Sequence, residues 1–363
     1  MIDDCLKLTT YFGERDRTDH AFVADAILDV YGRRRVETST LLRGAAGFGV
    51  KHHLRTDRLL TLSEDLPLVS IAVDRRERIE AVLEEVKAIR RRGLITLERA
   101  RMLSGALRPA DLAAEPSLPA KLTIYVGRQQ KVYGMPAHLA VCDLLHRRGI
   151  AGATVLLGVD GTARGERKRA RFFGRNADVP MMIVAVGDGP RIARVLPELG
   201  GLLRHPLLSL ERVTVCKRDG ELLARPPSLP GPDAEGLRQW QKLMVFGSEG
   251  TVVDGAAQHL TLIRRLRESG ARGATVLRGI WGFHGDHPPH GDRLLQLRRH
   301  VPVVTIVIDR PEAIDESFAI IDDVTRERGL VTSEIVPALE AITEERRFGG
   351  LHLARHTSDA DIR

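Results

Sequence analysis

The stretch "TLLRGAAGFG" at residues 40–49 recurs almost unchanged as "TVLRGIWGFHG" at residues 275–285. Both copies begin with an apolar run, continue with Arg-Gly and end with a glycine-phenylalanine pair. Self-similarity at a fixed spacing is typical of chains built from repeated structural units. The recurrence therefore raises the question of how many units this chain contains.

Three landmarks occur three times each: a lysine that opens a strand-like pattern, a glycine after the second apolar run, and a proline before the third. They are Lys7, Lys121 and Lys242, then Gly44, Gly158 and Gly279, and finally Pro67, Pro180 and Pro302. The lysines and the glycines keep the same spacings of 114 and 121 residues, and the prolines depart from these by one residue. The sequence therefore predicts three tandem units.

The segments between the copies are rich in proline, alanine and glycine, a composition that favours extended linkers. A chain of 363 residues is long enough for each of three units to bury its own core. We predict units at residues 1–108, 119–219 and 238–345, linkers at 109–118 and 220–237, and a tail at 346–363.

Strand and helix patterns follow one another in the order βαββαβ, which is the ferredoxin-like arrangement of an α+β fold. In the first unit the strands are expected at residues 7–12, 38–42, 68–73 and 94–97, and the helices at 21–31 and 79–89. Asp74 and Asp309 are expected to cap the second helices of the outer units. Pro197 is expected to shorten or kink the corresponding helix of the middle unit.

The composition is that of an ordinary globular protein with a net charge of +7 and a pI near 9.6. This charge is compatible with nucleotides, nucleic acid or an acidic membrane surface as partners. The three cysteines are widely spaced and form neither a disulfide framework nor a zinc motif. With no signal-like or spanning segment, a cytoplasmic protein is expected, and any membrane role would go through a partner.

The glycine-phenylalanine stretch is expected in a loop of about twenty residues between the second and third strands, and long loops are often functional. Glycines let backbone amides approach a phosphate, arginine forks bind it, and aromatic rings stack on a base. In the alternative interpretation the glycines form a bulge and the aromatic side chains cover the core. The candidate ligand-binding residues are Arg43, Gly44, Gly47, Phe48, Gly49, Arg278, Gly279, Trp281, Gly282, Phe283 and Gly285.

The motifs "KLTIYVG", "GATVLRGIWGFHG", "VPVVTIVID" and "ERGLVTSE" resemble the PII-like family that is often encoded beside fluoride-channel proteins. The resemblance implies a cytoplasmic, non-catalytic regulator that assembles as a trimer and binds an adenine nucleotide in clefts between subunits. It also implies that the long loop docks on a target such as an ion channel or transporter. Arg92 and Arg328, just before the last strands, are then candidates for phosphate contacts, or else ordinary cations at helix C-termini.

If the ancestral unit works as a trimer, three linked copies can close the same ring within one chain, because linking makes their association intramolecular. An intrachain pseudo-trimer is therefore predicted. The alternative is a chain of three separate units, each of which trimerises with copies from other chains.

The middle unit lacks the glycine-phenylalanine pair and carries a basic loop in its place. Its cations are Arg164, Arg167, Lys168, Arg169, Arg171 and Arg175. They can form a docking surface for an acidic partner, RNA or lipid headgroups, or simply a solvated loop. An RNA-binding or acidic-partner-binding scaffold is the alternative function, although an aromatic fraction of 4% makes a base-stacking platform incomplete.

His284, His287 and His290 are weak metal-ligand candidates, because no helix places their rings on one face. No catalytic motif stands out, and no enzyme is expected.

Overall fold

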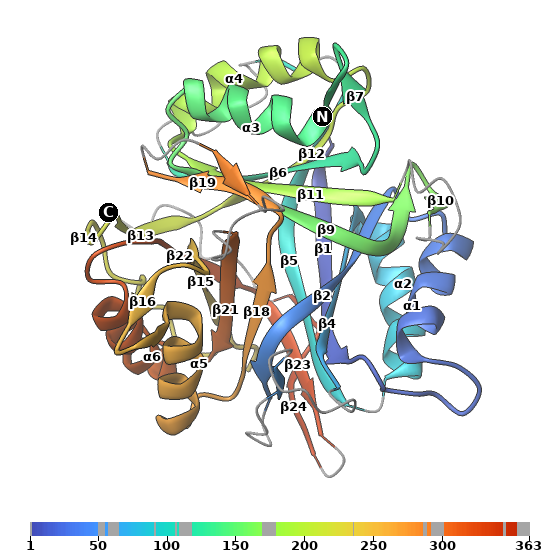
Figure 1. Ribbon diagram of the computed structural model, residues 1–363. Helices are drawn as coiled ribbons and strands as arrows, with labels where there is room; N and C mark the ends of the chain where they lie inside the picture. Colours follow the sequence, from blue (N-terminus) through green and yellow to red (C-terminus); the bar gives the residue numbers. More distant parts are fainter. Residues whose placement is uncertain are drawn as a thin grey trace.

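The computed structural model describes residues 2–49, 55–56, 65–90, 92–105, 107–108, 118–168, 179–234, 236–285, 289–291, 301–343 and 346–353. Three helix pairs lie on the outside of the molecule, and the strands face one another at its centre (Figure 1). The fold is therefore a mixed α/β structure in three repeat-like segments. Among the described helices, none has the length and apolar composition that crossing a bilayer requires.

The first unit begins at the N-terminus and ends in a long strand. Its elements are β1 (Ile2–Gly13), α1 (Val23–Arg33), β2 (Thr38–Phe48), β3 (Arg55–Thr56), β4 (Pro67–Arg75), α2 (Arg76–Ile89) and β5 (Gly93–Ser104).

The second unit adds short hairpins to the same pattern. Its elements are β6 (Ala120–Gly127), β7 (Lys131–Val132), β8 (Met135–Pro136), α3 (Ala137–Arg147), β9 (Gly152–Ala163), β10 (Glu166–Arg167), β11 (Pro180–Gly187), α4 (Gly189–Leu202), β12 (Leu207–Arg212), β13 (Thr214–Arg218) and β14 (Glu221–Leu222).

The third unit repeats the pattern once more. Its elements are β15 (Trp240–Ser248), β16 (Val252–Val253), β17 (Ala256–Ala257), α5 (Gln258–Glu268), β18 (Ala274–Arg278), β19 (Trp281–His284), β20 (His290–Gly291), β21 (Pro302–Asp309), α6 (Pro311–Val324), β22 (Leu330–Val336), β23 (Ala338–Ile342) and β24 (Arg347–Gly350).

Each unit has one antiparallel sheet in which the fourth strand pairs with the first, the first with the third, and the third with the second. The orders are β5-β1-β4-β2, β12-β6-β11-β9 and β22-β15-β21-β18. Each helix pair buries its apolar stripe against its own sheet, for example Ile79, Val82 and Val86 of α2. The three units therefore have the same strand order, each helix pair covers a core on its own sheet, and a further apolar cluster is shared by all three units.

The second strands also pair from unit to unit. The second half of β2 pairs with β18 of the third unit, the second half of β9 pairs with β2, and β19 pairs with β9. The chain at the end of each fourth strand, or just after it, also pairs with the fourth strand of another unit. The end of β5 pairs with β12, β13 pairs with β22, and β23 pairs with β5. Each unit therefore pairs with both of the other units through its second strand and its fourth strand, or the chain just after them.

A ring of six buried charges lies where the three sheets meet. It contains one lysine from each first strand and one glutamate from each fourth strand: Lys7, Lys121, Lys242, Glu98, Glu211 and Glu334. Within the units the Nζ–Oε2 distances are 3.1, 3.0 and 2.8 Å, and each lysine also contacts a glutamate of another unit. Burial opposes ionisation of Glu98, but Lys242, Lys7 and Lys121 hold its pKa below the ordinary value.

Two local predictions are wrong. Asp74 accepts a hydrogen bond from the Glu37 amide at 2.8 Å, and the residue that precedes α2 is Arg75, which makes no side-chain cap bond. In the third unit α6 likewise follows Arg310, because Asp309 faces the Arg272 amide. Of the shortening or kink predicted at Pro197, the shortening does not occur, because α4 has 14 residues like α2 and α6 and its apolar face stays packed on the sheet.

Candidate functional site

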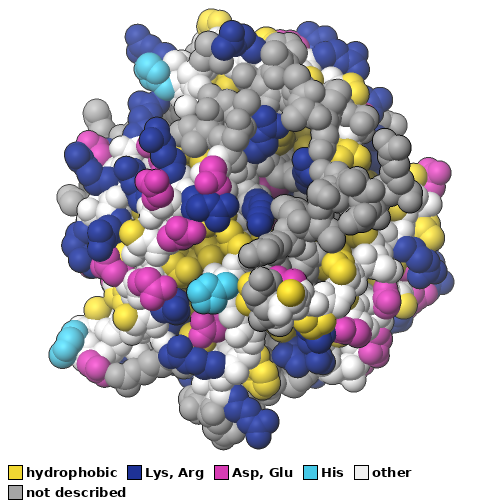
Figure 2. All heavy atoms as spheres, turned by 180° about the vertical axis from the view of Figure 1, so that it is seen from behind, with side chains coloured by type: hydrophobic (Ala, Val, Ile, Leu, Met, Phe, Trp, Pro, Cys, Tyr) yellow, Lys and Arg dark blue, Asp and Glu magenta, His cyan; other side chains and the backbone are white. Residues whose placement is uncertain are grey.

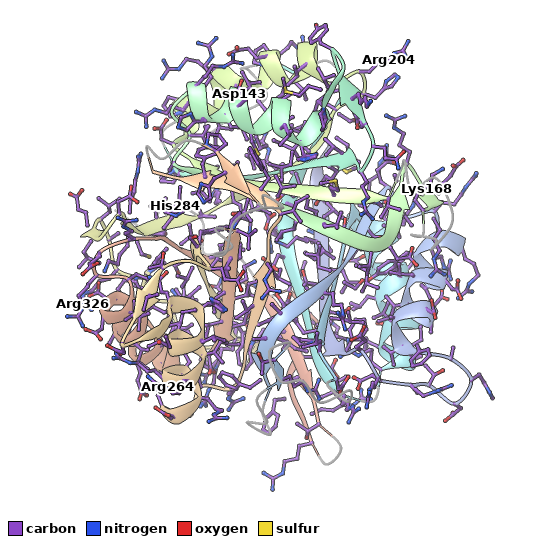
Figure 3. The ribbon with its side chains drawn as sticks, in the orientation of Figure 1. Asp143, Lys168, Arg204, Arg264, His284 and Arg326 are labelled. Carbon is purple, nitrogen blue, oxygen red and sulfur yellow. The ribbon has the colours of Figure 1, made fainter. Side chains whose placement is uncertain are left out.

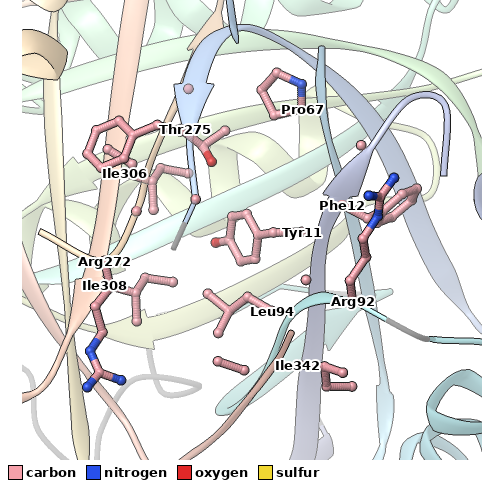
Figure 4. A pocket seen from close by; sticks show the side chains of 18 of the residues that line it. Tyr11, Phe12, Pro67, Arg92, Leu94, Arg272, Thr275, Ile306, Ile308 and Ile342 are labelled. Carbon is pink, nitrogen blue, oxygen red and sulfur yellow. The ribbon is translucent and has the colours of Figure 1, made fainter. Parts of the chain in front are cut away.

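A cavity of about 250 Å³ lies between the first and third units. The first unit contributes the end of β1, the end of β2 and the start of β5, and the third unit contributes β18, β21 and β23 (Figure 4). Its walls are mainly apolar, with Tyr11, Leu94, Trp240, Ile306 and Ile308 as the large side chains. An apolar pocket with a few convergent polar groups is the usual form of a small-molecule site.

Three arginines supply those polar groups. Arg92 donates to Asp16 at 2.8 Å, Arg55 pairs with Asp65 at 3.0 Å, and the Arg272 guanidinium lies 5.3 Å from the centre of the Phe348 ring. Arg272 also approaches Asp309, with 3.6 Å between Nε and Oδ1. A guanidinium has five N–H donors in a fixed fork, a geometry that suits the binding of anions.

Four of the sequence-predicted ligand-binding residues line this cavity: Gly47, Phe48, Gly49 and Arg92. Arg43 does not, because it forms a two-pronged ion pair with Glu14 at 2.9 and 2.8 Å. Arg278 also pairs with a glutamate, donating one hydrogen bond to Glu249 at 3.0 Å. Arg328 is exposed and lies outside the cavity lining.

The expected glycine-phenylalanine loop is instead a strand. Residues 44–48 continue β2 and pair with β18, and the third-unit copy, Trp281–His284, forms β19 on β9. Phe48 is buried in the core of the third unit and Phe283 in that of the second. Trp281 packs, partly buried, on the second core. The alternative interpretation, in which the aromatic residues cover a core, describes these positions, and the core belongs to a neighbouring unit.

The recurring glycines allow backbones to approach closely. An added Cβ would meet the proline that opens the third strand at Gly44 and Gly279, whose nearest Pro67 and Pro302 atoms are 2.6 and 3.1 Å away. At Gly47, Gly161 and Gly282 it would meet a carbonyl oxygen of the neighbouring unit at 2.8, 2.1 and 2.3 Å. At Gly285 the obstacle is Asp219. Strand pairing between units therefore accounts for most of the motif.

We expect Gly161→Ala to destabilise the protein by about 1–3 kcal/mol, because its Cβ would lie 2.1 Å from the Ser39 carbonyl oxygen. Gly201→Ala in α4 is the control, since nothing lies within 4 Å of its added Cβ and the change should stabilise by up to about 1 kcal/mol. Urea unfolding of both variants measures the difference. Equal effects of the two changes would show that the glycine is not required there.

The basic loop of the second unit is only partly described, and Arg169, Arg171 and Arg175 lie outside the described residues. Arg167 pairs with Asp160 of its own unit at 2.6 Å, and it also reaches the first unit, where it contacts Asp25 at 3.3 Å and Asp29. Lys168, labelled in Figure 3, pairs with Glu166 at 2.8 Å, and Arg164 is exposed in a turn. On the described part of the far face, basic and acidic side chains are interspersed (Figure 2).

The histidines do not form a metal site among the described residues. His284, at the end of β19 (Figure 3), lies 3.9 Å from Asp219 and 6.3 Å, between ring centres, from His290. His287 lies outside the described residues. Among the described residues, Glu98, Glu211 and Glu334 form a group of three potential metal ligands within 4.8 Å of one another, and three lysines already neutralise them.

Neither the charged ring nor most of the cavity was predicted from the sequence. The ring was visible as a repeated pattern, since a lysine in "KLT" or "KLM" and a glutamate in "LER" or "SEI" recur in each unit. Lys7 lies opposite Glu98, and the other two pairs have the same register. The cavity walls on β21 and β23 carried no such pattern.

The family described as "Uncharacterized ACR" (DUF190) matches the chain three times, over residues 5–102, 119–215 and 240–338. Each match falls within one of the three predicted units. A UPF0166 protein of Aquifex aeolicus (strain VF5) is 35% identical over 97 residues, which are 27% of this chain and 90% of that protein. The similar stretch thus has the length of one unit. This chain belongs to the PII-like DUF190 family, of which it carries three tandem copies.

Proposed function

We propose that this protein is a non-catalytic regulator that binds a small anion with an apolar body in the cavity between its first and third units. An adenine nucleotide is the first candidate. The observation that carries the proposal is the cavity itself, where apolar walls, the backbone of Gly47–Gly49 and three arginines converge between two units. Ligand binding there would then be signalled to a target protein, such as a channel or transporter.

The proposal includes the assembly. Three ferredoxin-like units would close as a pseudo-trimer within one chain, so that one chain takes the place of three separate subunits. The equal sets of inter-unit pairings and the charged ring support this arrangement. The three junctions then differ in sequence. At the junction of the first and second units, Tyr125 packs against Cys5, Val73, Met102 and Leu207.

A thermal-shift screen of the full chain against AMP, ADP and ATP tests the ligand. A ligand that binds only the folded state at a hundredfold excess over Kd stabilises it by about 2.7 kcal/mol. Arg92→Ala and Arg272→Ala should each weaken binding about tenfold or more, since each removes charge-assisted hydrogen bonds. Arg148→Ala, in an exposed ion pair with Glu198 at 2.7 Å, is the matched control and should leave the shift unchanged. The absence of any shift, or equal loss in the control, would contradict the proposal.

A further inference from the structure

One strand position carries an aromatic ring in all three units: Tyr11, Tyr125 and Phe246. The Tyr125 hydroxyl forms a hydrogen bond with Ser209 Oγ at 3.3 Å. Phe246 is 4% exposed and has no hydroxyl. In the second unit, therefore, the hydroxyl at this position is hydrogen-bonded, and in the third unit the ring has no hydroxyl.

Tyr11 differs from both. Thr96, which corresponds to Ser209, donates to Glu98 at 3.3 Å instead. No described residue gives the Tyr11 hydroxyl a hydrogen bond, and Figure 4 shows it turned toward Ile306 and Ile308 among the cavity lining. Aliphatic side chains cannot accept a hydrogen bond, so these two neighbours do not satisfy the hydroxyl. Burial raises the pKa of Tyr11, so its phenol stays protonated and remains a donor at neutral pH.

We propose that Tyr11 selects the effector by donating a hydrogen bond to an acceptor atom on the buried end of a planar heteroaromatic ring. This inference rests on the proposed function and narrows its ligand class. The anionic group of the same ligand remains near Arg92 and Arg272, which lie on either side of Tyr11 in Figure 4. A site that hydrogen-bonds a ligand discriminates against analogues that lack the matching atom. Anionic ligands of similar size that lack an acceptor atom at the buried end are therefore expected to bind more weakly.

Two nearly isosteric probes test the role of Tyr11 without any anionic group. Benzimidazole has a ring-nitrogen acceptor and indole does not, and at mildly alkaline pH both are neutral. Calorimetric titration of the full chain should give about five- to tenfold tighter binding of benzimidazole. Tyr11→Phe should abolish this preference, and the matched variant Tyr125→Phe should keep it, because its hydroxyl serves packing in another junction.

The proposal is overturned if the wild type binds both probes equally or neither, if the preference survives in Tyr11→Phe, or if Tyr125→Phe also loses it. The two proposals fail separately. A benzimidazole preference that depends on Tyr11, together with no nucleotide shift, removes the anionic effector and keeps the role of Tyr11. A nucleotide shift that is unchanged in Tyr11→Phe, without any preference between the probes, removes the role of Tyr11 alone.

Discussion

Replacing Lys121 with methionine is expected to destabilise the protein by about 3–5 kcal/mol, because the change leaves buried carboxylates without their counter-charge. Lys121 lies 3.0 Å from Glu211 and also contacts Glu334, and its side chain is 4% exposed. Two charges taken out of water are tolerated only while they are paired. Urea unfolding of the full chain measures the loss.

The control for this change is Lys87→Met. Lys87 pairs with Glu84 at 3.2 Å on the surface of α2, and exposed pairs of this kind contribute up to about 1 kcal/mol. If Lys121→Met costs no more than Lys87→Met, the ring does not hold the units together.

Phe283→Ala should cost about 3–5 kcal/mol, the usual range when a fully buried aromatic side chain is removed. Phe283 is 2% exposed, belongs to the third unit and packs in the core of the second, with its ring 5.1 Å from that of His146. The loss of stability should therefore appear in the second unit. Hydrogen exchange should accelerate in α3 and β9 more than in α5 and α6 of the third unit.

Tyr133→Ala is the control for Phe283, since that ring is 94% exposed at a hairpin tip and its loss should change stability by less than about 0.5 kcal/mol. Faster exchange confined to α5 and α6 would contradict the assignment of Phe283 to the core of the neighbouring unit.

The sequence predicted the three units and most of their elements because these depend on local patterns. The alternation at residues 7–12 and the helical spacing at 79–89 correspond to β1 and α2. The residues after Leu42 were predicted as a loop, since "RGAAGFG" has neither a strand alternation nor a helical period. They form a strand because β18 of the third unit provides an edge with which they pair, and because the glycines leave room for its backbone.

Only the part of the candidate site that lies in the first unit was predictable from the sequence. Gly47, Phe48, Gly49 and Arg92 lie in the first unit, where the repeated motif and the resemblance pointed. Residues such as Trp240 and Ile308 enter the cavity because the third unit packs against the first. A single sequence carries no pattern for that packing. Arg43 and Arg278 were misassigned for another reason, since each pairs with a glutamate of its own unit 29 residues earlier in the chain, and no local pattern predicts such a contact.

The mass of the particle in solution tests whether the three units close on one another within one chain. Native mass spectrometry of the full chain at low concentration distinguishes the two arrangements. We expect a folded particle with the mass of one chain, 40.1 kDa. A particle of three chains, in which each unit trimerises with its copies in other chains, would contradict it.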